Sequence, residues 1–306
     1  MYKRELIVTK ENHQLRIDDF AYQHHISRKA LKVIKQCGDI LVNGEHQTVR
    51  YVLNEGDYVV FIYPPEDNQI IPENVPLYIV YEDDFLLIVD KPKGMACFPT
   101  RSHPCQTLAN ALSYYYHSIE LDSTVHFVNR LDKDTAGLMM IAKYREIHDM
   151  MCQNIQHIYR RYQAHVEGQV EQGVIDLPIH KDGQNMRRII DENGKDSRTY
   201  YRCLEYSDGI SRVECILETG RTHQIRVHMA AIGHPLIGDL LYGGKPGTFD
   251  LESIMIAFVH PITKQIKVTQ VARAEEVMPV KTPGDPKIYK QQCIMDGHIN
   301  INVSSV

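Results

Sequence analysis

One segment of the sequence, residues 129–143, constrains the fold more than any other. It reads NRLDKDTAGLMMIAK, so that four charged side chains stand directly before a continuous apolar run that starts after Gly137. An uninterrupted apolar run of this kind is typical of a strand that is covered on both faces. We therefore expect a buried strand over residues 138–142, with Asp132 at the mouth of the core.

The position of Asp132 raises a question of charge. A carboxylate that is partly removed from water is costly unless a cation or hydrogen-bond donors stabilise it. Arg130 and Lys133 are the nearest cations in the sequence. Since Asp and Lys are common in turns, the segment taken alone also fits an ordinary charged turn before a strand. Asp134 could join Asp132 in a two-carboxylate mechanism only if the segment were extended, and we expect it at the surface.

A second segment, residues 217–243, carries the cation that Asp132 needs. It reads LETGRTHQIRVHMAAIGHPLIGDLLYG, with Arg226 among apolar residues. As a strand, the stretch HQIRVH would place Arg226 on a polar face; as a helix, Arg226 would share a face with Thr222 and Ala230. Either geometry leaves a cation on an otherwise apolar element, which requires an acidic partner or a side chain long enough to reach solvent. Asp132 is the natural partner.

Composition narrows the class of protein. The net charge of −5 over 306 residues argues against a generally basic nucleic-acid binder, so local clusters of cations decide that question. No stretch has the length of a membrane span, and the first residues lack the apolar run of a signal peptide, so we expect a cytoplasmic protein without a membrane partner. The seven cysteines are scattered and no two histidines stand at H-x-x-x-H spacing. This favours reduced thiols and no metal site.

Residues 1–63 form a predicted small α+β module. Ser27 is a plausible N-cap for a helix that stops at Gly38. Two strand-like segments follow, with turns at Asn43 and Gly44 and at Glu55 and Gly56. The spacing predicts that the apolar residues of the helix face inward, namely Ala30, Leu31, Val33 and Ile34.

Four cations lie within about two turns of that helix, namely Arg28, Lys29, Lys32 and Lys35. A charged helix face is usually solvated surface, and it can also contact RNA.

The rest of the chain divides into three further parts. Residues 64–76 hold four prolines and no amphipathic period, as in an extended linker. Residues 77–275 combine a helical pattern near residue 112 with many strand-like segments, which predicts an α+β domain on a mixed, mostly antiparallel sheet. Residues 276–306 are a C-terminal tail whose order the sequence does not define.

Several segments together resemble the RluA-type pseudouridine synthases. NRLDKDTAG is similar to the family signature H-R-L-D-x-x-T-S-G, and TGRTHQIRVHMAAIGHPLIGD is similar to its second signature. Between them, RRYQAHVEG resembles K-x-Y-x-A-x-V-x-G and GVIDLPI resembles G-x-I-x-x-P-I, while YEDDFLLIVDKPKGM resembles the opening strand and turn. These motifs cover residues 77–271 in family order.

The resemblance implies that uridines within RNA are isomerised to pseudouridine without a metal or organic cofactor. It implies that Asp132 is the catalytic aspartate and that Arg226 is its ion-pair partner. Tyr162 would stack on the target base, and Leu251 would pack on it. Arg130 would fill the space that the uridine leaves when it swings out of its helix.

The sequence departs from the family pattern at three places. Asn129 replaces the usual His, Ala136 replaces a Ser, and Glu252 stands where the family has His. Asn129 keeps the ability to donate a hydrogen bond, whereas Ala136 loses a hydroxyl. Neither change touches the carboxylate of Asp132.

The front module resembles the alpha-L RNA-binding motif over residues 13–61, through SRKALKVIKQCGDILVNG and VRYVLNEGDYV. The resemblance implies that the basic helix holds structured RNA. We expect a monomer that acts on large-subunit ribosomal RNA or on transfer RNA. The alternative is a non-catalytic RNA-binding or ribosome-assembly protein on the same fold. A glycosidase or phosphatase acting on small molecules would need neither the basic helix nor Arg130.

Overall fold

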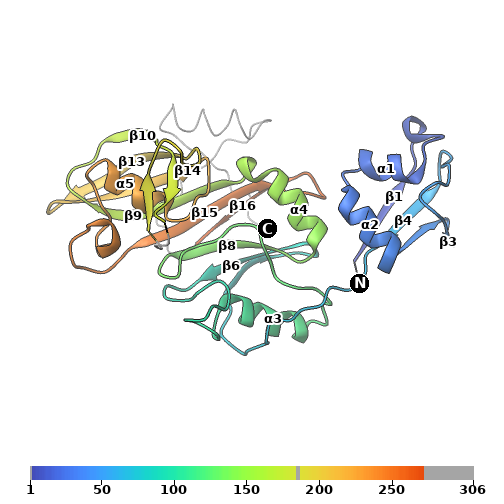
Figure 1. The fold of residues 1–306 in the computed structure, drawn as a ribbon, viewed down its shortest axis with the longest axis horizontal. Helices are drawn as coiled ribbons and strands as arrows, with labels where there is room; N and C mark the ends of the chain where they lie inside the picture. Colours follow the sequence, from blue (N-terminus) through green and yellow to red (C-terminus); the bar gives the residue numbers. More distant parts are fainter. Residues whose placement is uncertain (1, 184–186, 272–306) are drawn as a thin grey trace.

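A computed structural model describes residues 2–183 and 187–271, and Figure 1 shows their arrangement. A small sheet near the N-terminus and a large sheet built from later residues occupy different parts of the molecule. Among the described strands, β8 and β15 form the only parallel pair, and the other pairs of the large sheet are antiparallel. The predicted α+β class with a mixed, mostly antiparallel sheet is therefore confirmed.

The N-terminal part is a four-stranded antiparallel sheet with two helices, in the strand order β1-β4-β2-β3. As predicted, the Ser27 hydroxyl caps α2, accepting a hydrogen bond from the Ala30 amide over 3.1 Å. Asn43 and Gly44 have φ angles of 50° and 87°, as a tight two-residue hairpin turn requires. Its elements are β1 (Lys3–Ile7), η1 (Lys10–Asn12), α1 (Ile17–Gln23), α2 (Arg28–Cys37), β2 (Asp39–Val42), β3 (Glu45–His46) and β4 (Tyr58–Ile62).

One prediction for α2 is wrong. Leu31 and Ile34 are buried, but Val33 is 39% exposed. Residues three apart share a helix face, whereas Val33 lies two residues from Leu31 and points away from the core. The buried stripe of α2 is therefore narrower than its apolar composition suggests.

The large sheet contains ten strands, of which eight follow the order β10-β13-β14-β9-β15-β8-β6-β5, while β16 pairs with β15 and β7 with β8. Strands β11 and β12 form a separate hairpin. The elements are β5 (Ile79–Glu82), β6 (Leu86–Lys91), α3 (Leu108–Ser118), β7 (His126–Phe127), β8 (Ala136–Ala142), α4 (Arg145–Gln153), η2 (Ile155–His157), β9 (Tyr159–Glu167), β10 (Gln172–Asp176), β11 (Ile179–Lys181), β12 (Arg188–Ile190), β13 (Arg198–Ser207), β14 (Ile210–Leu217), α5 (Gln224–Ala231), η3 (Leu240–Tyr242), β15 (Leu251–Val259) and β16 (Ile266–Gln270).

The centre of the large sheet explains the apolar run that dominates the sequence. Every side chain of residues 138–142 is fully buried in β8. Met139 packs in the core that contains residues of α3 and α5, whereas Met140 packs on the opposite face with residues of α4. A strand covered on both faces has no polar side, and the predicted buried strand is confirmed.

Gly137 allows β8 to approach β15 closely. Its φ angle is +102°, and a Cβ atom built there would lie 2.2 Å from the carbonyl oxygen of Ser253. A side chain at this position would therefore clash with the backbone of β15 and strain the chain. The close pairing brings the loop that carries Asp132 beside the start of β15, where Leu251 lies.

The two sheets are joined by direct contacts and by residues 64–76. Arg4 pairs with Glu146 of α4, and the ring of Tyr2 stacks on Tyr144 with 4.5 Å between centroids. Residues 64–76 contain neither helix nor strand; their carbonyl groups at Ile70 and Ile71 accept hydrogen bonds from α3 side chains over 2.8 Å. The tail predicted over residues 276–306 lies outside the described residues. None of the helices in the described ranges is long and apolar enough to cross a membrane.

Candidate active site

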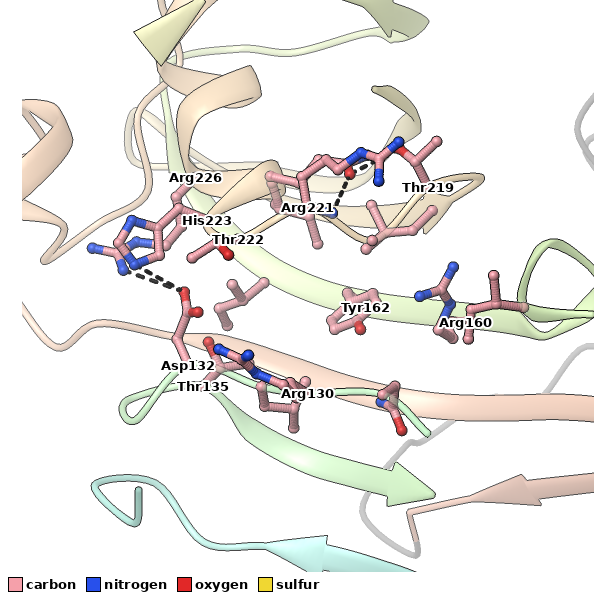
Figure 2. A pocket seen from close by; sticks show the side chains of 18 of the residues that line it. Arg130, Asp132, Thr135, Arg160, Tyr162, Thr219, Arg221, Thr222, His223 and Arg226 are labelled. Carbon is pink, nitrogen blue, oxygen red and sulfur yellow. Dashed lines mark hydrogen bonds and ion pairs between the residues drawn. The ribbon is translucent and has the colours of Figure 1, made fainter. Parts of the chain in front are cut away.

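A pocket of about 500 Å³ opens between segments that are far apart in the sequence. Figure 2 shows its lining, which comes from the loop before β8, from β9, from the loop that leads into α5, and from the start of β15. Five residues that the family resemblance assigned to catalysis, to the target base or to the space that the flipped uridine leaves all line it: Arg130, Asp132, Tyr162, Arg226 and Leu251. Folding therefore collects in one place the residues that the motifs distributed over 122 positions.

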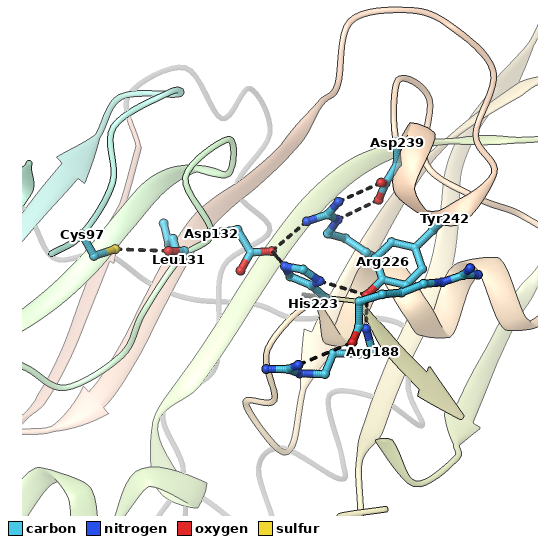
Figure 3. Close-up of polar contacts among 9 residues, drawn as sticks. Cys97, Leu131, Asp132, Arg188, His223, Arg226, Asp239 and Tyr242 are labelled. Carbon is cyan, nitrogen blue, oxygen red and sulfur yellow. Dashed lines mark hydrogen bonds and ion pairs between the residues drawn. The ribbon is translucent and has the colours of Figure 1, made fainter. Parts of the chain in front are cut away.

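Asp132 and Arg226 meet across the pocket as the sequence predicted. The Nη1 atom of Arg226 donates to Oδ2 of Asp132 over 3.3 Å. The other side of the guanidinium donates two hydrogen bonds to Asp239, from Nε over 2.7 Å and from Nη2 over 2.8 Å (Figure 3). Because a forked pair fixes both position and orientation, Asp239 aims Arg226 at Asp132.

Asp239 is a residue that sequence reasoning missed. Its side chain is 1% exposed, whereas that of Asp132 is 24% exposed and faces the pocket. Burial alone would lower the pKa of Arg226, but the hydrogen bonds and charge of Asp239, together with the charge of Asp132, outweigh it and raise that pKa. Arg226 therefore stays charged, and Asp132 remains the more accessible of its two acidic partners.

The helical alternative for HQIRVH is the correct one, and His223 precedes that helix in an unusual conformation. His223 has a φ angle of 58° and its Nε2 atom lies 3.7 Å from Oδ2 of Asp132. Its Nδ1 atom forms a 2.9 Å hydrogen bond with the hydroxyl of Tyr242. Burial, only partly offset by Asp132, lowers the pKa of His223, so the imidazole is neutral at pH 7. The motif TGRTHQIR contains His223, but no feature of the sequence indicated a role for it.

The loop that carries Asp132 is anchored by hydrogen bonds from Lys91. This fully buried side chain donates three hydrogen bonds of 3.0 Å each, to the carbonyl oxygens of Pro92, Met95 and Lys133. Burial lowers its pKa to about 8. Three acceptors for one ammonium group satisfy every donor it has, so Lys91 holds the segment of Pro92 and Met95 against the loop that carries Asp132.

Comparison with known proteins identifies the family. A family model described as RNA pseudouridylate synthase matches residues 85–231. The chain is 39% identical over 260 residues to the uncharacterized RNA pseudouridine synthase YjbO of Bacillus subtilis (strain 168), covering 81% of this chain and 92% of YjbO. The chain belongs to the RluA-type RNA pseudouridine synthases.

Other relatives agree with this assignment. Identity is 36% over 263 residues to the ribosomal large subunit pseudouridine synthase D of Pasteurella multocida (strain Pm70), covering 78% of this chain and 81% of that protein. Among solved structures, human RNA pseudouridylate synthase domain containing 1 matches with a TM-score of 0.53 and 25% identity, over 65% of this chain and 84% of that one. The protein is thus an RNA pseudouridine synthase with an RNA substrate.

The structure shows where the residues that depart from the family signature lie and what they contact. The side-chain oxygen of Asn129 accepts a 2.7 Å hydrogen bond from the Met140 amide, and its side-chain nitrogen is buried without a partner. Asn129 therefore acts as an acceptor that holds the loop on β8, and not as the donor considered from the sequence. Ala136 and Glu252 are paired neighbours in the parallel β8–β15 ladder.

Strand β9 contributes two buried side chains to the pocket of the synthase. Tyr162 is 5% exposed, and burial raises its pKa, which keeps the phenol protonated. Arg160, two residues earlier, is 4% exposed and was not singled out from the sequence. Every second residue of a strand lies on the same face. The position of Arg160 two residues before Tyr162 could therefore have indicated that both side chains face the pocket.

Other charged residues lie away from the pocket centre. Lys133 contacts His103 over 2.8 Å and not Asp132, and Asp134 is exposed as expected. Arg130 is exposed at the rim of the pocket. The predicted RNA-contacting cations project from α2 in the N-terminal part, and all four are exposed: Arg28, Lys29, Lys32 and Lys35.

Proposed function

We propose that this enzyme isomerises specific uridines of large-subunit ribosomal RNA to pseudouridine in this pocket, with Asp132 as the catalytic carboxylate. One observation carries the proposal: the buried Asp239 orients Arg226, which in turn holds the partly exposed Asp132 facing the pocket. A preorganised carboxylate of this kind can stabilise positive charge on a sugar carbon without moving during the reaction. The relative from Pasteurella multocida, named a ribosomal large subunit synthase, supports this choice of RNA.

The target uridine has to leave its stack to reach Asp132, since this carboxylate lies in a pocket lined by side chains and is only 24% exposed. Tyr162 and Leu251 supply flat and apolar surfaces for the uracil ring. Arg130 at the exposed rim occupies the space that the flipped nucleotide leaves in the RNA helix. In this arrangement the ribose lies at the Asp132 end, the base lies over Tyr162, and the phosphates remain at the rim.

The proposal includes a division of labour along the chain. Residues 1–63 form the RNA-binding module, residues 64–76 the linker and residues 77–275 the catalytic domain. The exposed cations of α2 supply a patch that contacts phosphates away from the pocket. A protein with a net charge of −5 needs such a local concentration of cations to bind RNA.

The deciding experiment is a pseudouridine map of ribosomal and transfer RNA from cells with and without the gene, obtained by carbodiimide treatment and primer extension. We expect one or a few pseudouridines to disappear from large-subunit ribosomal RNA. Wild-type protein should restore them, and Asp132→Asn should not, with at least about a thousandfold loss of rate in vitro. An unchanged map would favour the non-catalytic RNA-binding alternative, and a loss confined to transfer RNA would contradict the choice of substrate.

The role of α2 is tested through the salt dependence of RNA binding. Lys29→Gln with Lys32→Gln should lower the slope of log K against log[salt] by about 1.5, because each lost phosphate contact contributes about 0.7–0.9. The control is Lys245→Gln with Lys264→Gln, which removes two exposed cations elsewhere on the chain. Equal slopes for the α2 variant and the wild type would contradict an RNA contact at α2.

A further inference from the structure

Arg160 is a buried cation in the pocket without an acidic partner. Its Nε atom has no hydrogen-bond partner, and within the described residues no acid forms an ion pair with its guanidinium. The next residue, Arg161, is equally buried on the opposite face of β9 and its Nε atom likewise has no partner, but its Nη1 atom lies 3.2 Å from Oε2 of Glu214. Leaving a buried guanidinium unpaired is costly, so the contrast between these neighbours calls for a functional reason.

Arg160 lies at the far end of the pocket from Asp132. Figure 2 shows Asp132 at one end, Arg160 at the other and Tyr162 between them. Arg160 and Tyr162 are two residues apart on one strand, so their Cα atoms are about 7 Å apart and their side chains share a face. A Cβ atom at Gly220 would lie 2.6 Å from Nη1 of Arg160, so the absence of a side chain there makes room for the guanidinium.

The depth of Arg160 identifies the part of the nucleotide that it meets. A flipped nucleotide enters a pocket with its base leading, while its phosphates stay attached to the neighbouring nucleotides outside. Those phosphates remain within reach of exposed groups at the rim, where Arg130 lies, whereas Arg160 is 4% exposed. With the ribose at Asp132 and the ring over Tyr162, the guanidinium faces the carbonyl edge of the uracil.

We propose that Arg160 is a further catalytic residue, which stabilises the negative charge on the uracil ring after the ring has separated from the ribose. This inference rests on the proposed function. When the bond between C1′ and N1 breaks, its electron pair passes to the ring and spreads onto the two carbonyl oxygens. The positive charge left at C1′ faces the carboxylate of Asp132. C5 of the ring then bonds to C1′, the hydrogen of C5 leaves as a proton, and N1 gains a proton, which yields neutral pseudouridine.

The absence of an acidic partner is what this role requires. The uracil of the bound substrate is neutral and the detached ring is an anion, so Arg160 stabilises the detached state more than the bound substrate, which is the condition for catalysis. A carboxylate beside Arg160 would neutralise it and repel the anion. Water is largely excluded at this depth, and the attraction between guanidinium and ring is correspondingly stronger.

The test measures single-turnover release of tritium from large-subunit ribosomal RNA labelled at C5 of uridine, prepared from cells that lack the protein. With full-length enzyme in saturating excess, Arg160→Met should react about 100–1000-fold more slowly than wild type. RNA affinity, measured by filter binding, should change less than threefold. Arg160→Lys should fall between them, since it keeps the charge without the fork. Arg212→Met, which removes an arginine outside the pocket that pairs with Glu205, is the matched control and should retain wild-type rate and affinity.

Chemical rescue separates this role from a structural one. Millimolar guanidinium chloride should raise the rate of Arg160→Ala, whereas the same concentration of sodium chloride should not, because only the guanidinium ion can replace the lost group in the cavity. A saturated rate of Arg160→Met equal to wild type, even with weaker RNA binding, overturns the inference, as does the absence of rescue. If the wild-type enzyme itself releases no tritium, the proposed function fails instead.

Discussion

The two ends of the pocket hold two arginines that differ in one respect. Arg226 is flanked by Asp239 and Asp132, whereas Arg160 has no acidic partner within the described residues. The charge of Arg226 is used inside the protein, where it fixes the direction of the Asp132 carboxylate, for which we propose the catalytic role. The charge of Arg160 is left available to whatever enters the pocket. The buried cation Arg226 thus orients another side chain of the protein, whereas we propose that the buried cation Arg160 interacts with the substrate.

The largest expected effect follows from removing Arg226, which lies at the end of the pocket where the arginine has acidic partners (the paired end). Arg226→Met leaves Asp239, which is 1% exposed, without its forked partner. Removal of one member of a buried pair costs about 3–5 kcal/mol, so the free energy of unfolding in urea should fall by that amount, and pseudouridine formation should be lost. The double variant Arg226→Met with Asp239→Asn should regain part of the stability and none of the activity. A single variant as stable as wild type would contradict the role given to Asp239.

Removing Arg160, at the end of the pocket where the arginine has no acidic partner among the described residues (the unpaired end), should not lower the free energy of unfolding. Arg160→Met removes a buried charge whose pKa burial has already lowered, so without RNA the free energy of unfolding should stay unchanged or rise by about 1 kcal/mol. Urea unfolding under the same conditions gives the direct comparison with Arg226→Met. A loss of stability as large as that of Arg226→Met would show that Arg160 has a structural role like that of its counterpart.

The smallest expected effect concerns pH at the paired end. Burial lowers the pKa of His223 below 6.5 in the folded protein, so the unfolded chain binds this proton more readily. The free energy of unfolding should therefore decrease as the pH falls from 6.5 through the folded pKa, and His223→Gln should reduce that decrease by less than about 1 kcal/mol. Urea unfolding between pH 5 and pH 8 measures how the free energy of unfolding changes with pH. An NMR titration of the imidazole measures the pKa of His223, for comparison with the ordinary histidine value of about 6.5. A folded pKa above 6.5 would contradict the assignment of a neutral imidazole.

The sequence predicted local features well because their causes are local. The cap of α2 at Ser27 and the continuous apolar run of β8 can both be recognised from residues that are neighbours in the sequence. The pairing of Asp132 with Arg226 was predicted from the cost of a buried charge and from the family motifs. The choice between strand and helix for HQIRVH was left open, because an eight-residue element has too few turns for its periodicity to decide.

Other features escaped prediction because they depend on which face a side chain occupies. Val33 has the composition of a core residue, but the packing of α2 on its sheet leaves it exposed. Asp239 comes 13 residues after Arg226, beyond the helix, and no periodicity connects the two. Asn129 accepts a hydrogen bond because β8 presents the Met140 amide to it, which depends on the pairing of strands.

By itself, the sequence determined the fold class and the family, and it predicted that Asp132, Tyr162 and Arg226 belong to one site, since these follow from local patterns and motif order. The structure places all three residues at one pocket. Tertiary structure decided what each charge does. Arg160 and Arg161 are adjacent and chemically identical, yet the alternation of a strand sends one toward Glu214 and the other into the pocket. The energy of a buried charge depends on its surroundings in three dimensions, and only the assembled sheet supplies those surroundings.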